Sequence, residues 1–209
     1  MIRLPRLLAV VTAVGCATLA AASGTAAAHS PSEQQAAYGQ FLEFFVETPT
    51  AENPLGTGDK CADYGGYLTP VPVPEDPSIT CKVSRDTRLL VNVWGSFCTS
   101  ATDPPNRTPR ELRACALNSN SGIVQTWATL DGRPIRVSET FTPFLVVDVP
   151  ASNILGVPAQ RTGASGHGWT ALVGRLSPGV HRLVQHVEGT YAGSPLDWTL
   201  EAKIIVRGH

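Results

Sequence analysis

The residues best suited to acid–base chemistry are a histidine in a glycine-rich segment and a glutamate upstream of it. His167 ends the run Gly163-Ala164-Ser165-Gly166-His167, and Glu139 lies in an earlier β-rich stretch. An imidazole and a carboxylate can transfer protons when they meet within hydrogen-bond reach, about 3 Å. The run is not a hydrolase elbow, because that motif needs glycine two residues after its serine, where His167 stands. His167 and Glu139 are therefore the candidate catalytic residues.

Aromatic and cationic side chains offer a second kind of site, for binding a ligand. The candidates are Trp127, Phe141, Arg161 and Trp169. Residues 161–169 are predicted to form a mobile loop on a rigid β scaffold, where binding residues usually lie, with Trp169 starting the next strand. A cavity lined by Trp127, Phe141, Phe144 and Trp169, with Glu139 as an acid, would suit a cofactor-free enzyme. Such an enzyme accelerates its reaction mainly by orienting the substrate.

The spacing of the histidines and cysteines does not predict a metal site. His181 and His186 lie five residues apart on one predicted strand, so their side chains point to opposite faces and cannot chelate one metal together. Four-thiolate zinc sites usually contain closely spaced cysteine pairs, whereas Cys61, Cys81, Cys98 and Cys115 follow one another at 20, 17 and 17 residues. We therefore predict no metal and no cofactor. The motifs leave both an enzyme and a non-enzymatic protein open.

The N-terminal residues have the pattern of a secretory signal. Arg3 and Arg6 precede an apolar run that begins at Leu7, and Ala26-Ala27-Ala28 fits a small-residue cleavage site. We expect cleavage after Ala28 and a secreted, extracellular chain without a transmembrane segment. The alternative is a lipoprotein cut before Cys16, which would tether the domain to a membrane face.

The chain that remains after cleavage suits one domain with little net charge. Removal of residues 1–28 leaves 181 residues with 14 basic and 17 acidic side chains. Because no cluster of lysine and arginine is present, we expect no nucleic-acid partner. Four cysteines in an exported chain indicate disulfides, for which three pairings exist. The short, turn-rich segments between them favour Cys61–Cys81 and Cys98–Cys115.

Helix and strand signals predict a mainly β fold. A capping box indicates a short N-terminal helix within residues 29–48, and a second box at Thr108 indicates one inserted helix. Residues 49–209 are expected to form a single β domain, an antiparallel β-sandwich or a closed barrel with two disulfides.

Some boundaries within this domain can be predicted more closely. Asp131-Gly132 separates β-rich runs at 123–130 and 133–142, which predicts a hairpin with positive φ at both turn residues. The last run, 196–206, alternates apolar and polar residues and should have one buried and one wet face. Residues 49–80 are rich in proline and glycine and are predicted to be loop.

Four segments combine cysteines, turns and strand patterns. They are Cys81-Lys82-Val83 with the following Leu89-Leu90-Val91-Asn92-Val93, then Leu112-Arg113-Ala114-Cys115-Ala116, Ala128-Thr129-Leu130-Asp131-Gly132-Arg133-Pro134 and Leu176-Ser177-Pro178-Gly179-Val180-His181. In these segments the chain resembles a family of uncharacterised bacterial secreted proteins over residues 53–206. The resemblance implies a disulfide-stapled β domain and no particular activity.

Three functions are compatible with these features. The first is an exported, non-enzymatic binding or envelope-associated module, whose partner would be a small molecule, a glycan or an envelope protein. The second is a cofactor-free cyclase or isomerase with an apolar molecule in a barrel cavity, and the third is a hydrolase or metal-binding protein with an unrecognised site. An enclosed apolar cavity of about 300 Å³ or more would favour a small-molecule site, and a filled core with an exposed aromatic patch would favour a partner or polymer.

Overall fold

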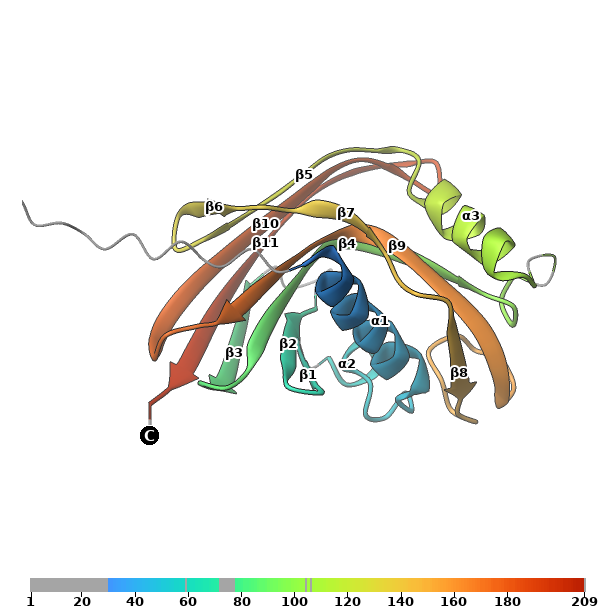
Figure 1. Ribbon diagram of the computed structural model, residues 1–209, viewed down its shortest axis with the longest axis horizontal. Helices are drawn as coiled ribbons and strands as arrows, with labels where there is room; N and C mark the ends of the chain where they lie inside the picture. Colours follow the sequence, from blue (N-terminus) through green and yellow to red (C-terminus); the bar gives the residue numbers. More distant parts are fainter. Residues whose placement is uncertain (1–29, 59, 72–77, 104, 106, 209) are drawn as a thin grey trace, which may run out of the picture.

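The computed structural model describes residues 30–58, 60–71, 78–103, 105 and 107–208, so the predicted signal lies outside the described residues. The helices are α1 Pro31–Glu47, α2 Pro54–Thr57 and α3 Pro109–Ser119. The strands are β1 Cys61–Tyr64, β2 Tyr67–Pro70, β3 Ser78–Ser84, β4 Arg88–Thr99, β5 Ile123–Leu130, β6 Arg133–Ile135, β7 Ser138–Phe141, β8 Leu145–Val149, β9 Gln160–Arg175, β10 Gly179–Tyr191 and β11 Ser194–Arg207. Figure 1 shows their arrangement.

The strands form two sheets that pack face to face. The first sheet has the order β1-β2-β4-β9-β7, with β8 also paired to β9, and the second has the order β3-β11-β10-β5-β6. Among the described residues the sheets stay separate, so the sandwich prediction is correct and the closed-barrel alternative is not. Most pairs are antiparallel, as predicted, but β2–β4 and β3–β11 are parallel.

The core between the sheets is built from the inward faces of the long strands. β11 contributes four fully or nearly fully buried residues, Leu200, Ala202, Ile204 and Val206. The residues between them, such as Glu201 and Lys203, are exposed. The predicted alternation of this strand is therefore confirmed.

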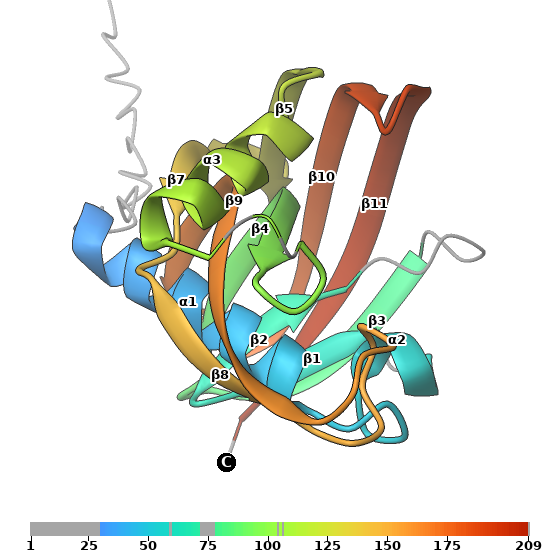
Figure 2. The same cartoon turned by 90° about the vertical axis from the view of Figure 1, so that its right-hand side faces the viewer.

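Helix α1 covers the outer face of the first sheet (Figure 2). The Ser30 side chain caps its N-terminus, and Pro31 takes the first helical position, where no intrahelical N–H is needed. Tyr38 and Phe41 pack against β1 and β2, and Val46 packs against β8 and β9. Tyr38 and Phe41 are thus part of the domain interior.

Both disulfides have the pairing that the short segments favoured. Cys61–Cys81 joins β1 of the first sheet to β3 of the second, and Cys98–Cys115 joins β4 to α3. The first bridge ties the two layers together. The second holds the inserted helix against the sheet, where Leu112 is fully buried.

The predicted hairpin is present, but the strand after it is shorter than expected. Asp131 and Gly132 have φ values of 52° and 74°, as the primed turn requires. Residues 133–142 do not form one strand, because β6 belongs to the second sheet and β7 to the first. The chain crosses between the layers at residues 136–137, and this crossing places β7 beside β9.

Residues 49–80 contain more regular structure than their proline and glycine content predicted. They include α2, β1, β2 and the start of β3. Gly65 and Gly66, with φ values of 52° and 82°, make the turn between β1 and β2. Both strands lie at one edge of the first sheet, where short strands are tolerated. Residues 72–77 of the proline run lie outside the described residues.

The glycine-rich segment that was predicted to be a mobile loop is instead part of the continuous strand β9. Its glycines are sites of close packing. A Cβ at Gly166 would lie 3.0 Å from Thr142 Cγ2, and a Cβ at Gly168 would lie 2.5 Å from the Trp94 carbonyl oxygen. Glycine within a strand often marks such an approach of neighbouring atoms, and the sequence alone does not distinguish it from a flexible loop.

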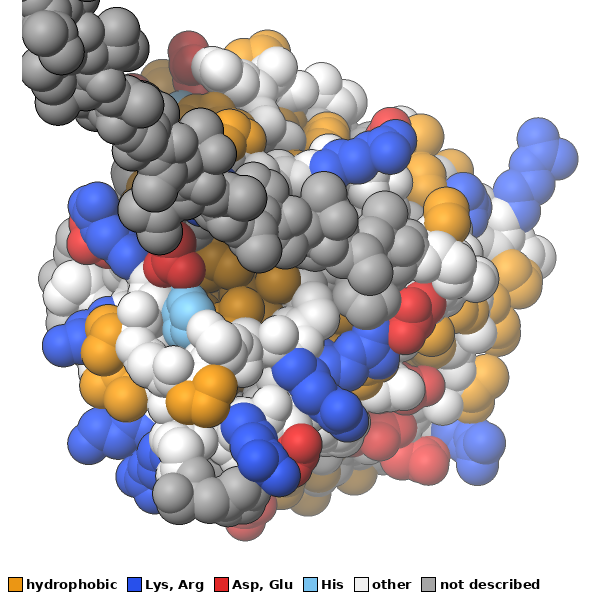
Figure 3. All heavy atoms as spheres, turned by 60° about the vertical axis from the view of Figure 1, so that its left-hand side comes forward, with side chains coloured by type: hydrophobic (Ala, Val, Ile, Leu, Met, Phe, Trp, Pro, Cys, Tyr) orange, Lys and Arg blue, Asp and Glu red, His pale blue; other side chains and the backbone are white. Residues whose placement is uncertain are grey.

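Charged side chains of both signs are interspersed on the face shown in Figure 3, around a hollow that contains hydrophobic side chains. This distribution agrees with the small net charge of the chain. No helix in the described part of the chain is long and apolar enough to cross a membrane.

Replacing Gly168 by alanine should lower the free energy of unfolding by about 1–3 kcal/mol, because the added methyl group has no room beside the Trp94 carbonyl. Gly163→Ala, on the same strand, is the matched control. Its methyl group would meet the ring of Phe144, which is 44% exposed and can move aside. Urea unfolding of both variants checks the difference. A neutral effect at both positions would support the loop prediction instead.

Candidate functional site

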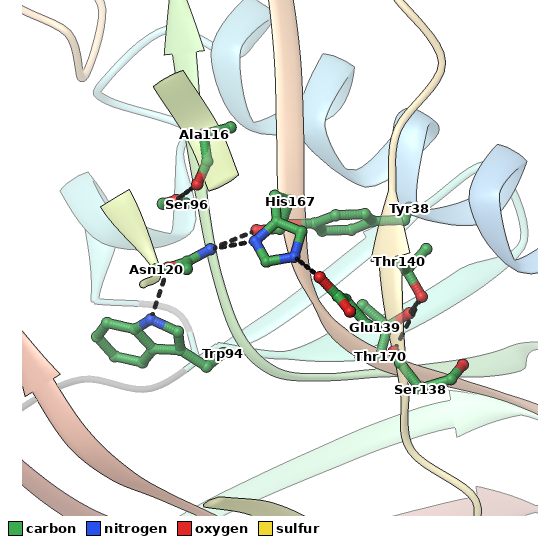
Figure 4. Close-up of polar contacts among 10 residues, drawn as sticks. All are labelled: Tyr38, Trp94, Ser96, Ala116, Asn120, Ser138, Glu139, Thr140, His167 and Thr170. Carbon is green, nitrogen blue, oxygen red and sulfur yellow. Dashed lines mark hydrogen bonds and ion pairs between the residues drawn. The ribbon is translucent and has the colours of Figure 1, made fainter. Parts of the chain in front are cut away.

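The two candidate catalytic residues are in contact. His167 on β9 pairs with Phe141 on β7, and Trp169 pairs with Glu139, so all four side chains lie on one face of the first sheet. His167 Nε2 lies 2.8 Å from Glu139 Oε1 (Figure 4). The imidazole is 1% exposed and the carboxylate is 54% exposed. The pair therefore joins a buried ring to a carboxylate at the surface.

Asn120, which follows α3, fixes the tautomer of His167. The indole of Trp94 can only donate, so Asn120 Oδ1 accepts from Trp94 Nε1 at 3.0 Å, and the amide nitrogen faces His167. Asn120 Nδ2 then donates to His167 Nδ1 at 3.0 Å and to the His167 carbonyl at 2.8 Å. Because Nδ1 accepts, the ring proton is on Nε2 and is donated to Glu139.

This arrangement leaves His167 without a free lone pair. A general base must accept a proton from a substrate within hydrogen-bond reach. The lone pair of Nδ1 is engaged by Asn120, and Nε2 carries the proton bound to Glu139. The exposed carboxylate is the end of this hydrogen-bonded chain that faces solvent. The geometry is that of a structural link between α3, β9 and β7.

Tyr38 connects the same strand to α1. Its hydroxyl group donates to the His167 carbonyl oxygen at 3.2 Å. Burial raises the pKa of Tyr38 far above its ordinary value, so the hydroxyl keeps its proton. The hydroxyl lies over Gly95 and Gly168, which face each other on β4 and β9 and leave a notch between the strands. One backbone carbonyl thus accepts hydrogen bonds from both sides of the sheet.

The aromatic rings beside His167 are engaged within the protein. Phe141 lies 4.5 Å from His167 between ring centroids, and Trp169 lies 5.1 Å from it. The guanidinium of Arg113 on α3 lies over Phe141, with Cζ 3.6 Å from the ring centroid. Such cation–π contacts hold both groups in place. Phe141 therefore contributes to the packing of α3 on the sheet.

The structure separates the other predicted ligand-binding residues from this cluster. Trp127 lies on the outer face of the second sheet and stacks on His186, with ring centroids 5.2 Å apart. Arg161 is exposed near the start of β9, six residues from His167, or about 20 Å along an extended strand. The rings of Trp127, Phe141, Phe144 and Trp169 therefore do not line one cavity.

Sequence reasoning missed three residues of this network: Tyr38, Arg113 and Asn120. Tyr38 lies within the predicted N-terminal helix, but its hydroxyl partner is a backbone carbonyl that no sequence pattern indicates. Asn120 follows a predicted helix, where asparagine is common as a cap. Its side chain instead reaches a strand 47 residues away.

A cavity of about 160 Å³ lies between α1 and the first sheet. Its walls are largely apolar and include Phe41 and Phe45 of α1, Val71 beyond β2, and Phe97 of β4. Leu55 of α2, which is 50% exposed, also lines it and marks its side nearest to solvent. An apolar cavity of this size is large enough for one benzene ring.

Cys98, Cys115 and Asp103 are close enough to share a metal ion in principle. The two sulfur atoms are bonded to each other, however, and a disulfide offers no thiolate to a metal. The Asp103 carboxylate accepts hydrogen bonds from Thr99 and Thr102. This cluster therefore stabilises a turn.

His181 forms a second histidine–carboxylate pair, at the β5–β6 turn. Its Nδ1 lies 2.7 Å from Asp131 Oδ2, and its Nε2 lies 2.8 Å from the Ser177 carbonyl oxygen. Both partners accept, so the doubly protonated ring fits best. Burial lowers the pKa of His181, but the hydrogen bonds to Asp131 and Ser177 and the charge of Asp131 together raise it above its ordinary value.

Comparison with known proteins finds few likenesses: no family model and no curated protein matches the chain. Among solved structures it is similar to a cysteine protease inhibitor, EhICP2, from Entamoeba histolytica, with a TM-score of 0.23 and 10% identity over 68% of this chain and 94% of that one. It is also similar to the solution structure of amebosin, with a TM-score of 0.20 and 14% identity over 68% of this chain and 96% of that one. At these TM-scores the likenesses carry no functional argument.

Asn120→Ala should lower the free energy of unfolding by about 1–3 kcal/mol, because it leaves the Trp94 N–H and His167 Nδ1 without their partner. Chemical denaturation measures the loss. Asn118→Ala, at an exposed position of the same helix, is the control and should change stability by less than about 0.5 kcal/mol. Similar values for the two variants would show that the network does not hold α3.

Asp131→Asn should remove part of the pH dependence of stability. The pKa of His181 is raised in the folded state. The stabilisation that protonated His181 adds to the fold is therefore complete below about pH 6.5 and is lost as the pH rises through the folded pKa. The pKa of Asp131 is lowered, because its bonds to His181 and Arg182 outweigh burial, which acts in the opposite direction. The stabilisation by ionised Asp131 is therefore present above about pH 4 and is lost as the pH falls through the folded pKa.

The pair should therefore stabilise the fold most between about pH 4 and pH 6.5. Asparagine also accepts positive φ, so the variant keeps the turn. Urea unfolding at pH 5.5 and pH 8 should give a larger loss of stability with rising pH for the natural chain than for Asp131→Asn. Equal losses would contradict the assignment, as would an unchanged His181 titration by NMR.

Proposed function

We propose that this protein is an exported, non-enzymatic binding module that holds a small, largely apolar molecule in the cavity beneath α1. The observation that carries the proposal is the cavity itself. It is formed by two elements, α1 and the first sheet, that are fixed to each other by buried packing. Ligand sites are typically concave, mostly apolar and present before the ligand binds.

The state of His167 supports binding rather than hydrolysis. The 2.8 Å contact with Glu139 meets the distance that proton transfer requires. Asn120, however, occupies the lone pair that a base would use, and the ring is 1% exposed. A hydrolase with His167 as its base would have to break this buried bond in every cycle.

The cavity is smaller than the roughly 300 Å³ that would favour a small-molecule site in general, so its size restricts the proposed ligand to about one ring and does not support the substrate of a cyclase. Pockets for drug-sized molecules usually have volumes of about 300–1,000 Å³. The cavity beneath α1 has about 160 Å³. The four rings that would have lined a barrel cavity are also dispersed over both sheets. A cyclase or isomerase is therefore less well supported.

Three features support export. The first 28 residues have the pattern of a secretory signal, two disulfides are formed, and the chain resembles secreted proteins in its cysteines and turns. A binding module of this kind would meet its ligand outside the cell. Attachment to the envelope through Cys16 would leave the cavity unchanged.

NMR titration with toluene tests the cavity as a binding site. Toluene should shift the signals of Phe41, Val71 and Phe97, which line the cavity. Val71→Phe should abolish these shifts, because the larger side chain fills the space. The control is Val124→Phe, at a position 75% exposed on β5, and it should bind toluene like the natural chain. Shifts confined to other residues, or toluene binding that Val71→Phe does not weaken, would contradict the proposal.

A further inference from the structure

The outer face of the second sheet carries no helix within the described part of the chain. Helix α1 packs on β7, β8 and β9, and α3 packs on β4 and β9, so both helices contact strands of the first sheet. Figure 1 shows β5 and β10 along the top of the molecule with no helix above them. This face is therefore available to a partner.

The centre of this face is aromatic and apolar. Val184 and His186 alternate along β10 with the core residues Leu183 and Val187, so their side chains point outward. Trp127 is paired directly with His186, and the two rings stack with their centroids 5.2 Å apart. The indole is 38% exposed. Interfaces between proteins typically have such an aromatic centre within a polar rim.

The charged side chains of this face are sorted by sign along the strands. Arg182 and Lys203 are directly paired on one side of the centre, and Glu188 and Asp197 are directly paired on the other. All four are exposed, and Arg182 also binds Glu201 at 2.6 Å. Like charges that lie opposite each other on a sheet repel. Both pairs would therefore gain from charges of the other sign.

A second copy of the same face supplies these charges. The two-fold axis would lie in the plane of the interface, midway between the two charged pairs and perpendicular to the strands. Lys203 then faces the partner's Asp197, and each such contact occurs twice by symmetry. Arg182 likewise faces the partner's Glu188. An axis parallel to the strands would place like charges together, so the charges select the antiparallel arrangement.

The size of this face fits a stable interface. Its four long strands have 7, 14, 13 and 8 residues in β3, β11, β10 and β5. At about 3.3 Å per residue and about 4.8 Å between strands, these strands cover about 670 Å². Stable interfaces of standard size bury about 600–1,000 Å² on each partner.

We propose that two copies of this protein associate through the outer faces of their second sheets, with Lys203 of each chain against the partner's Asp197. The Trp127–His186 row lies near the centre of this dimer, and the charged pairs lie on either side of it. The cavity beneath α1 belongs to the other layer of each subunit and stays accessible. The dimer is therefore independent of the proposed ligand.

Sedimentation equilibrium of the mature chain tests this inference. The natural chain should show a monomer–dimer equilibrium whose dissociation constant rises with added NaCl, because salt screens exposed charges. Lys203→Glu and Asp197→Lys should each weaken the dimer at least about tenfold, since each variant places two like-charge contacts in the interface. Arg110→Glu, at an exposed position on α3, is the control for altered net charge and should dimerise like the natural chain.

An equimolar mixture of Lys203→Glu and Asp197→Lys gives the sharpest result. In a mixed dimer both contacts again join opposite charges, so the mixture should dimerise although neither variant does so alone. Recovery also shows that both variants are folded. A natural chain that stays monomeric up to high micromolar concentrations would overturn the inference without any variant. Folded variants that do not recover in the mixture would also overturn it, as would equal weakening by Arg110→Glu. Because toluene binding beneath α1 is measured separately, failure of the dimer leaves the proposed function standing.

Discussion

The hydroxyl group of Tyr38 determines how closely α1 lies against the first sheet. It occupies the notch left by Gly95 and Gly168, a directly paired couple on β4 and β9, and donates to the backbone carbonyl of His167. A side chain on either glycine would push the helix away. With α1 fixed at this point, Phe41 and Phe45 face β4 at a distance that leaves a ring-sized cavity. The candidate binding site is thus a consequence of one close contact.

The His167–Glu139 and His181–Asp131 pairs differ because their second partners differ. Asn120 donates to His167, so the ring needs only one proton, whereas the Ser177 carbonyl accepts from His181, so that ring fits best with two. The carboxylate partner alone does not distinguish these cases, because each histidine contacts one carboxylate oxygen at less than 3 Å. The donor or acceptor on the other nitrogen does: Asn120 is 47 residues from His167, whereas Ser177 is only four residues from His181.

The sequence predicted the turns, helix ends and strand faces that are determined by residues close together in the chain. The Asp131-Gly132 turn, the capped helices and the alternation of β11 depend on neighbours within a few residues. Gly166 and Gly168 were misread because their role depends on contacts with Thr142 and Trp94, which are remote in sequence. The crossing of the chain between sheets at residues 136–137 also depends on the tertiary fold, since both flanking runs have strand character. His167 and Glu139 were predicted as residue types, but Asn120, which decides their chemistry, was not.

Native mass spectrometry of the protein exported by its own host tests the central claim most directly. We expect the mass of a chain with two disulfides plus one small, largely apolar molecule, which excess toluene displaces. Val71→Phe, exported in the same way, should carry no such molecule. A bare mass for the natural chain, or an adduct that persists in Val71→Phe and resists toluene, would contradict the claim that the space beneath α1 is a ligand site.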